Sequence, residues 1–144
     1  MSSTVGIRRL AAAGVGTALF ASGLLTMTAG PAHAATPVCT KTVTKSNGGF
    51  SGPVAAASNG SLNCQLGPGN RGSAVKALQN SLWRCSTANP GAIDGVYGGN
   101  TKAAVAKLQR SKNVRPADGL YGPKTRKVFY WLIKGPQGAV CSKF

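Results

Sequence analysis

Three segments of the sequence carry apolar residues at the spacing of an amphipathic helix. In the first, Val75, Leu78 and Leu82 fall at i, i+3 and i+7, so they share one face of a helix. Ser73 stands where an N-cap is needed, because its hydroxyl can accept from the first free N–H groups. This helix is expected to end near Cys85.

The second segment repeats this arrangement further along the chain. Thr101 is its expected N-cap, Val105 and Leu108 face inward, and Asn113 and Pro116 bracket its end. The spacing predicts a second short helix that packs against the first.

The third segment begins after Thr125, the expected N-cap, and places Val128, Phe129 and Leu132 on one face. It ends at residues 134–136, Lys-Gly-Pro. Together the three segments predict a mainly α protein, a compact three-helix bundle around one small core.

An eight-residue motif links these helices. Residues 94–101, Asp-Gly-Val-Tyr-Gly-Gly-Asn-Thr, return 24 residues later as residues 118–125, Asp-Gly-Leu-Tyr-Gly-Pro-Lys-Thr. An aspartate before a glycine can accept from the backbone two residues on, and glycine adopts positive φ. The repeat therefore predicts two equivalent structural turns, formed by Asp94, Gly95, Gly98, Asp118, Gly119 and Gly122.

The order of these motifs resembles the peptidoglycan-binding-like domain of bacterial wall enzymes. A Gly-x-x-Val-x-x-Leu-Gln string at residues 72–79 precedes the two Asp-Gly-x-Tyr-Gly-x-x-Thr motifs, and the resemblance runs from Leu66 to Leu132. It implies a three-helix bundle that holds a neighbouring catalytic domain on peptidoglycan. This chain differs from that pattern in its flanking cysteines, its extreme charge and the absence of a catalytic domain.

The N-terminal residues have the pattern of a secretory signal peptide. Arg8 and Arg9 precede an uncharged apolar stretch from Leu10 to Leu25, and residues 32–34, Ala-His-Ala, form a cleavage site. The alternative, a membrane anchor, is less favoured because a spanning helix needs about 20 apolar residues. The arginine pair leaves twin-arginine export open beside the favoured general secretory route. We therefore expect a secreted, wall-associated protein without a membrane span after cleavage.

The boundaries predicted from these patterns divide the chain into four parts. Residues 1–34 are the signal peptide, 35–65 an N-terminal extension with a short hairpin, 66–134 the binding domain and 135–144 a tail.

Four cysteines in an exported chain predict two disulfides. Three pairings are possible, and we favour Cys39–Cys64 and Cys85–Cys141. The first would close the extension, and the second would join the end of the first helix to the tail.

The charge indicates a polyanionic partner. Of the 17 lysine and arginine residues, Arg8 and Arg9 lie in the predicted signal peptide, which leaves 15 against 2 acidic residues, a net charge of +13. Roughly 2–8 net charges suffice for the solubility of a small domain. Outside the cell the expected partners are peptidoglycan and anionic wall polymers, with a secreted wall enzyme as a further candidate and no nucleic acid.

Basic residues lie at all three predicted helix starts, where acidic residues are usual. We hypothesise that the second and third helix starts form a receptor for stem-peptide carboxylates or teichoic acid phosphates. The alternative is that the basic composition alone places basic residues there.

Tyr97 and Tyr121 can either pack in the core or offer a face to a sugar. Trp83 and Trp131 are expected at the core edge, with Trp131 the better candidate for a surface contact. The candidate substrate-binding residues are Tyr97, Thr101, Lys102, Tyr121, Lys124, Thr125, Arg126 and Trp131.

Enzymatic activity is not expected. Asp94 and Asp118 are the only acidic side chains and both have predicted structural roles, whereas glycan hydrolysis normally needs two free carboxylates. The only histidine is His33, in the predicted signal peptide, so neither a zinc site nor a Ser-His-Asp triad, and no cofactor, is expected. Residues 73–76 match the Ser-x-x-Lys nucleophile motif, but the companion motifs are missing.

We favour a secreted, non-catalytic peptidoglycan-binding protein. The alternatives are an accessory of a lytic enzyme or weak hydrolase, and a cationic effector or protease inhibitor.

Overall fold

The computed structural model describes residues 34–144, so the predicted signal peptide lies outside the described residues except for Ala34. No helix in the described part of the chain is both long and apolar enough to cross a membrane. The elements, in chain order, are β1 (Lys41–Asn47), β2 (Phe50–Ala56), α1 (Ser73–Cys85), α2 (Gly99–Ser111), α3 (Pro123–Arg126), β3 (Trp131–Gly135) and β4 (Gly138–Ser142).

The four strands form one antiparallel sheet in the order β1-β2-β3-β4. The first two pair along their whole length around the turn at Gly48 and Gly49, whose φ angles of 57° and 82° suit a two-residue hairpin turn. This is the hairpin expected within residues 35–65. It is not peripheral, because Val54 and Ala55 of β2 are fully buried in the common core.

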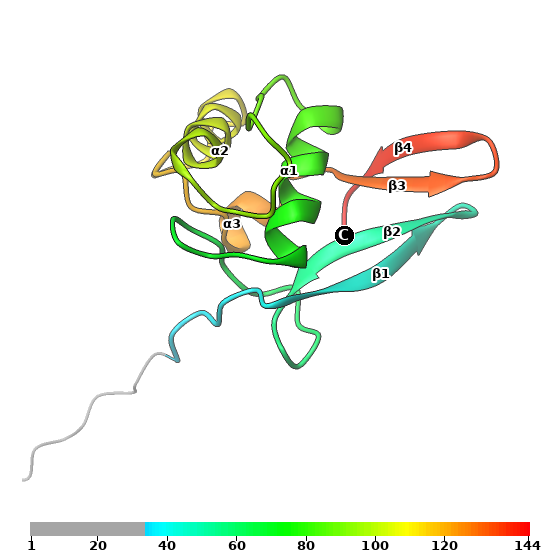
Figure 1. The fold of residues 1–144 in the computed structure, drawn as a ribbon, viewed down its shortest axis with the longest axis horizontal. Helices are drawn as coiled ribbons and strands as arrows, with labels where there is room; N and C mark the ends of the chain where they lie inside the picture. Colours follow the sequence, from blue (N-terminus) through cyan, green and yellow to red (C-terminus); the bar gives the residue numbers. More distant parts are fainter. Residues whose placement is uncertain (1–33) are drawn as a thin grey trace, which may run out of the picture. The chain divides into compact units, whose positions relative to one another are not determined.

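Helix α1 lies between the sheet on one side and α2 and α3 on the other (Figure 1). Its predicted apolar stripe is confirmed, since Val75, Leu78 and Leu82 are all buried. The stripe of α2 is confirmed in the same way by the burial of Val105 and Leu108.

The predicted third helix is wrong. Helix α3 is one turn, and the chain enters β3 where Leu132 was expected on a helix face. Residues 128–133 form an unbroken run of aromatic, β-branched and other apolar residues, which favours a strand buried on both faces. In β3 three consecutive side chains, Trp131, Leu132 and Ile133, are buried, as expected of a strand covered on both faces.

The mainly α three-helix bundle is therefore the wrong fold class for the chain as a whole. The structure has two 13-residue helices, a single helical turn and a four-stranded antiparallel sheet. The sheet is made by residues on both sides of the helical segment in the sequence.

A cluster of three aromatic rings forms the junction between the helical part and β3. The ring centroids of Tyr121, Phe129 and Trp131 lie 4.8 to 5.7 Å apart, all in edge-to-face arrangement. Such pairs stabilise by about 0.5–1.5 kcal/mol beyond their buried area.

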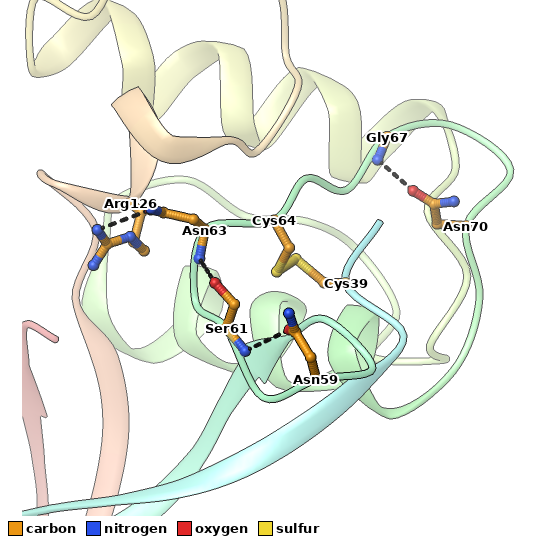
Figure 2. The surroundings of a disulfide bond; sticks show 8 residues. All are labelled: Cys39, Asn59, Ser61, Asn63, Cys64, Gly67, Asn70 and Arg126. Atoms are coloured by element: carbon orange, nitrogen blue, oxygen red, sulfur yellow. Dashed lines mark hydrogen bonds between the residues drawn. A yellow bond between two sulfur atoms is a disulfide. The ribbon is translucent and has the colours of Figure 1, made fainter. Parts of the chain in front are cut away.

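Two disulfides join distant parts of the chain, in the pairing favoured from the sequence. The bond between Cys39 and Cys64 ties the start of the hairpin to the loop before α1 (Figure 2). The bond between Cys85 and Cys141 ties the last residue of α1 to β4.

Candidate functional site

A buried glutamine holds the first Asp-Gly turn. The side-chain amide of Gln79, on α1, donates to the Asp94 carboxylate at 2.9 Å, to the Val96 carbonyl at 3.0 Å and to the Thr101 hydroxyl at 3.1 Å. Its carbonyl oxygen accepts from the Gly95 N–H at 2.8 Å. The turn is thus built around one side chain from the preceding helix.

The second turn has the same construction. The amide of Gln109, on α2, donates to Asp118 at 3.1 Å, to the Leu120 carbonyl at 2.9 Å and to Thr125 at 3.0 Å. Its carbonyl oxygen accepts from the Gly119 N–H at 2.8 Å. The structural unit is therefore a helix followed by the turn that its glutamine binds, used twice.

The carboxylates complete both turns locally. Asp94 accepts from the N–H of Val96, and Asp118 accepts from the N–H of Leu120, two residues on in each case. These are the bonds expected of an aspartate before glycine. The amide of Gln79, followed by the Val96 N–H, holds the pKa of the Asp94 carboxyl below its usual range.

The glycine after each aspartate lets the helix backbone approach the turn. Gly95 and Gly119 have φ angles of 77° and 75°. A Cβ would lie 3.2 Å from the carbonyl oxygen of Gly72 in the first turn, and 2.6 Å from that of Lys102 in the second. Only glycine fits this combination of positive φ and close contact.

The two threonines do not cap their helices as predicted. Helices α2 and α3 begin three residues earlier than predicted, so their N-caps are Gly98 and Gly122, which make no side-chain cap bond. Thr101 and Thr125 are each the third residue of the helix, and each is buried with its hydroxyl bonded to a glutamine. Ser73 is likewise inside its helix, after the N-cap Gly72.

The aromatic residues proposed as sugar contacts are inside the core. Tyr97, Tyr121 and Trp131 are at most 1% exposed, so none presents a ring face to a ligand. The Tyr97 hydroxyl donates to the Gly119 carbonyl at 2.7 Å and so joins the two turns. Burial raises the pKa of both tyrosines well above its usual value. Trp83, expected at the core edge, is instead 50% exposed.

Of the three proposed basic contacts, Arg126 already has partners within the protein. The Arg126 guanidinium donates to the Phe144 carbonyl at 2.8 Å and to Asn63 at 3.2 Å, so it fixes the chain terminus and the loop beside the first disulfide (Figure 2). Lys102 and Lys124 remain exposed. The stem of Lys102 packs on Gly119, which places it beside the second turn.

Each turn borders a small surface pocket at the start of the next helix. The first turn pocket, of about 240 Å³, is lined by Gln79, Asp94, Gly98, Asn100 and Thr101 among others. The second turn pocket has a volume of about 390 Å³. Its lining includes Gln109, Asp118, Leu120, Gly122, Lys124 and Thr125, and Lys124 takes the place of Asn100. These pockets are the part of the helix starts that a small polar ligand could reach.

Sequence reasoning missed the central role of Gln79 and Gln109. The signal for it was present in the sequence. The two glutamines occupy the same position when the two repeats are aligned, and each follows a leucine that is buried. A polar residue in the apolar face of both repeats indicates a buried side chain with fixed partners.

This helix-and-turn unit is shared with a known class of protein. Residues 71–129 match the family described as a putative peptidoglycan binding domain, and this segment of the chain belongs to that family. The match begins just before α1 and ends before β3, so all four strands lie outside it.

Two individual proteins are similar to the chain over different lengths. An uncharacterized protein in the bpoA1 3'region of Kitasatospora aureofaciens is 36% identical over 134 residues, which cover 92% of this chain and 100% of that protein. The crystal structure of the SleB N-terminal domain is 34% identical, covers 45% of this chain and 86% of its own, and has a TM-score of 0.41.

Proposed function

We propose that this protein is exported and binds peptidoglycan without catalysing its cleavage. The observation that carries the proposal is the family match over residues 71–129, the segment in which Gln79 and Gln109 hold the two turns. The excess of 15 basic over 2 acidic residues after residue 34 supports an anionic polymer as the ligand.

Within this proposal, Lys102 and Lys124 contact anionic groups of the wall. Both are exposed, Lys102 lies against the second turn, and Lys124 lines the second turn pocket. Stem-peptide carboxylates and wall-polymer phosphates are the groups of matching charge. The buried members of the predicted set act by holding this surface in place, and they are Tyr97, Thr101, Tyr121, Thr125 and Trp131.

The absence of catalysis is proposed from the state of the two carboxylates. Asp94 and Asp118 are the only two acidic side chains, and each accepts through Oδ1 from a glutamine amide and a backbone N–H, so both carboxylates already have a structural role in a turn. Export is proposed from the pattern of residues 1–34, and two disulfides are typical of an oxidising compartment.

A pair of charge-matched variants tests the contacts. Lys102→Gln/Lys124→Gln removes the two lysines beside the second turn, and Lys41→Gln/Lys134→Gln removes two exposed lysines from the sheet. Each pair lowers the net charge equally. We expect the first pair to lower affinity for purified sacculi at least several-fold more than the second. Equal losses would show that overall charge binds the wall without a site at the turns.

A further inference from the structure

A sizeable cleft among residues 34–144 is lined by none of the residues of the two turns. It has a volume of about 720 Å³, within the roughly 300–1,000 Å³ typical of small-ligand sites. The end of α1 and the loop after it form one wall, and the end of α2 forms another. Tyr130 and Cys141 close it, and both lie beyond the segment that matches the family.

The floor of this cleft is apolar and its rim is cationic. Ala88, Leu108 and Phe129 line it and are at most 5% exposed. Arg84 and Lys112 line it from the exposed surface.

Aromatic surface and a further cation lie on the same rim. Tyr130 is 37% exposed, and the Lys143 ammonium lies 4.9 Å from its ring centroid. This combination of a partly exposed ring and nearby cations suits a ligand with both a flat apolar face and a negative charge.

Some backbone acceptors near the two helix ends already have partners. The Leu82 carbonyl accepts from the Ser86 hydroxyl, and the Thr87 carbonyl accepts from the Lys107 ammonium. At the end of α2, Asn113 adopts φ 55°, and the N–H groups of Asn113 and Val114 donate to the carbonyls of Arg110 and Gln109.

Within residues 34–144, no acidic side chain is bonded to the cations at the rim. The two acidic side chains of the chain, Asp94 and Asp118, are bonded to glutamines in the turns. Among the described residues, neither Arg84 nor Lys112 donates a side-chain hydrogen bond to a protein acceptor. An external anion is the complementary group.

We propose that this cleft binds an anionic saccharide, with Arg84 and Lys112 pairing its acidic group and Tyr130 packing on the sugar ring. The charge comes from a carboxylate or a phosphate, and a planar guanidinium matches either one. The choice of a saccharide rests on the proposed wall-binding function. The site is separate from the turn pockets, so a single molecule would contact the wall in two places.

Amide chemical shifts measured on the full oxidised protein test the proposal. The probes are N-acetylmuramic acid, N-acetylglucosamine, which is the same sugar without the lactyl carboxylate, glucose 1-phosphate and inorganic phosphate. We expect saturable shifts at Arg84, Lys112 and Tyr130 with the first and third probes and none with N-acetylglucosamine. The tighter binder of the two acidic sugars identifies the acid group as carboxylate or phosphate. No shifts at the cleft, or equal shifts with inorganic phosphate alone, would overturn the proposal.

A double variant tests the same site by affinity. Arg84→Gln/Lys112→Gln removes both charges, and we expect about a tenfold weaker Kd for the acidic sugar, because two exposed charged contacts are lost. The Lys41→Gln/Lys134→Gln control should leave it unchanged, and unfolding curves check that both variants fold. An unchanged Kd in the cleft variant would count against the site.

The result is separable from the proposed function. If the protein is retained on sacculi while the cleft stays silent to every probe, this inference fails and wall binding stands. If the cleft binds acidic sugar but sacculi do not retain the protein, wall binding fails and the cleft site stands.

Discussion

Gln79 and Gln109 are the residues on which the two turns depend. Each satisfies an aspartate, a backbone carbonyl, a threonine and a glycine N–H with one side chain. A buried amide with every group paired fixes one geometry, because leaving any partner unpaired is costly. The exposed surface at the helix starts therefore rests on two buried glutamines.

Replacing Gln109 with alanine is expected to destabilise the fold by about 2–3 kcal/mol, since it leaves buried polar groups unpaired. Gln137→Ala, at an exposed position between β3 and β4, is the matched control and should change stability little. Urea unfolding measures both. Similar midpoints for the two variants would mean that the Gln109 network does not hold the second turn.

The Asp94 carboxyl gives the fold a pH dependence of known sign. Its pKa is lowered in the folded state, chiefly by the Gln79 amide, so its contribution is present above the ordinary value of 3.8 and is lost as pH falls through the lower folded value. We expect Asp94→Asn to lose less stability than the unmodified protein between pH 5 and pH 2. Parallel losses in urea unfolding would contradict this.

The hydrophobic pattern predicted the burial of aliphatic residues better than the burial of aromatic residues. Val75, Leu78 and Leu82 lie where the helical period places them. Trp83 and Trp131 each adjoin a buried leucine, yet Trp83 is 50% exposed and Trp131 is fully buried. The difference comes from the element each belongs to, which the local pattern did not reveal.

At the scale of elements, the first two helices were predictable and the third was not. Phe129 and Leu132 fit a helical spacing, but the run around them also fits a buried strand, and short apolar runs allow both. The strand forms because β4 pairs with it through the turn at residues 136–137 and β2 lies on its other side. The pairing of Lys134 in β3 with Ser51 in β2 joins residues that are far apart in the sequence, so a short stretch of sequence around β3 does not reveal it.

The contact between β2 and β3 depends on a glycine. A Cβ on Gly52 would lie 2.7 Å from the Leu132 carbonyl oxygen, which is backbone and cannot move aside. We expect Gly52→Ala to destabilise by about 1–3 kcal/mol through overpacking. Gly99→Ala, at the first position of α2 with nothing within 4 Å, is the control. Equal thermal midpoints for the two variants would exclude a tight contact at this point.

At the scale of the whole molecule, the sequence resemblance described the helical segment and not the sheet around it. The family match ends at residue 129, and every strand lies outside it. The two disulfides were predictable because four cysteines allow few pairings. The Cys85–Cys141 bond joins the helical segment to β4, whereas the Cys39–Cys64 bond joins the start of the hairpin to the loop before α1. The glutamine-bound turns, by contrast, needed the three-dimensional arrangement to be understood.

We propose that a shaped surface, and not charge alone, binds peptidoglycan. Co-sedimentation of the oxidised protein with sacculi stripped of teichoic acid, at low salt and at 1 M salt, separates the two, because the Debye length at 1 M salt is about 3 Å. We expect stripped sacculi to retain the protein at 1 M salt. Complete release of the protein under those conditions would instead attribute wall binding to the net positive charge.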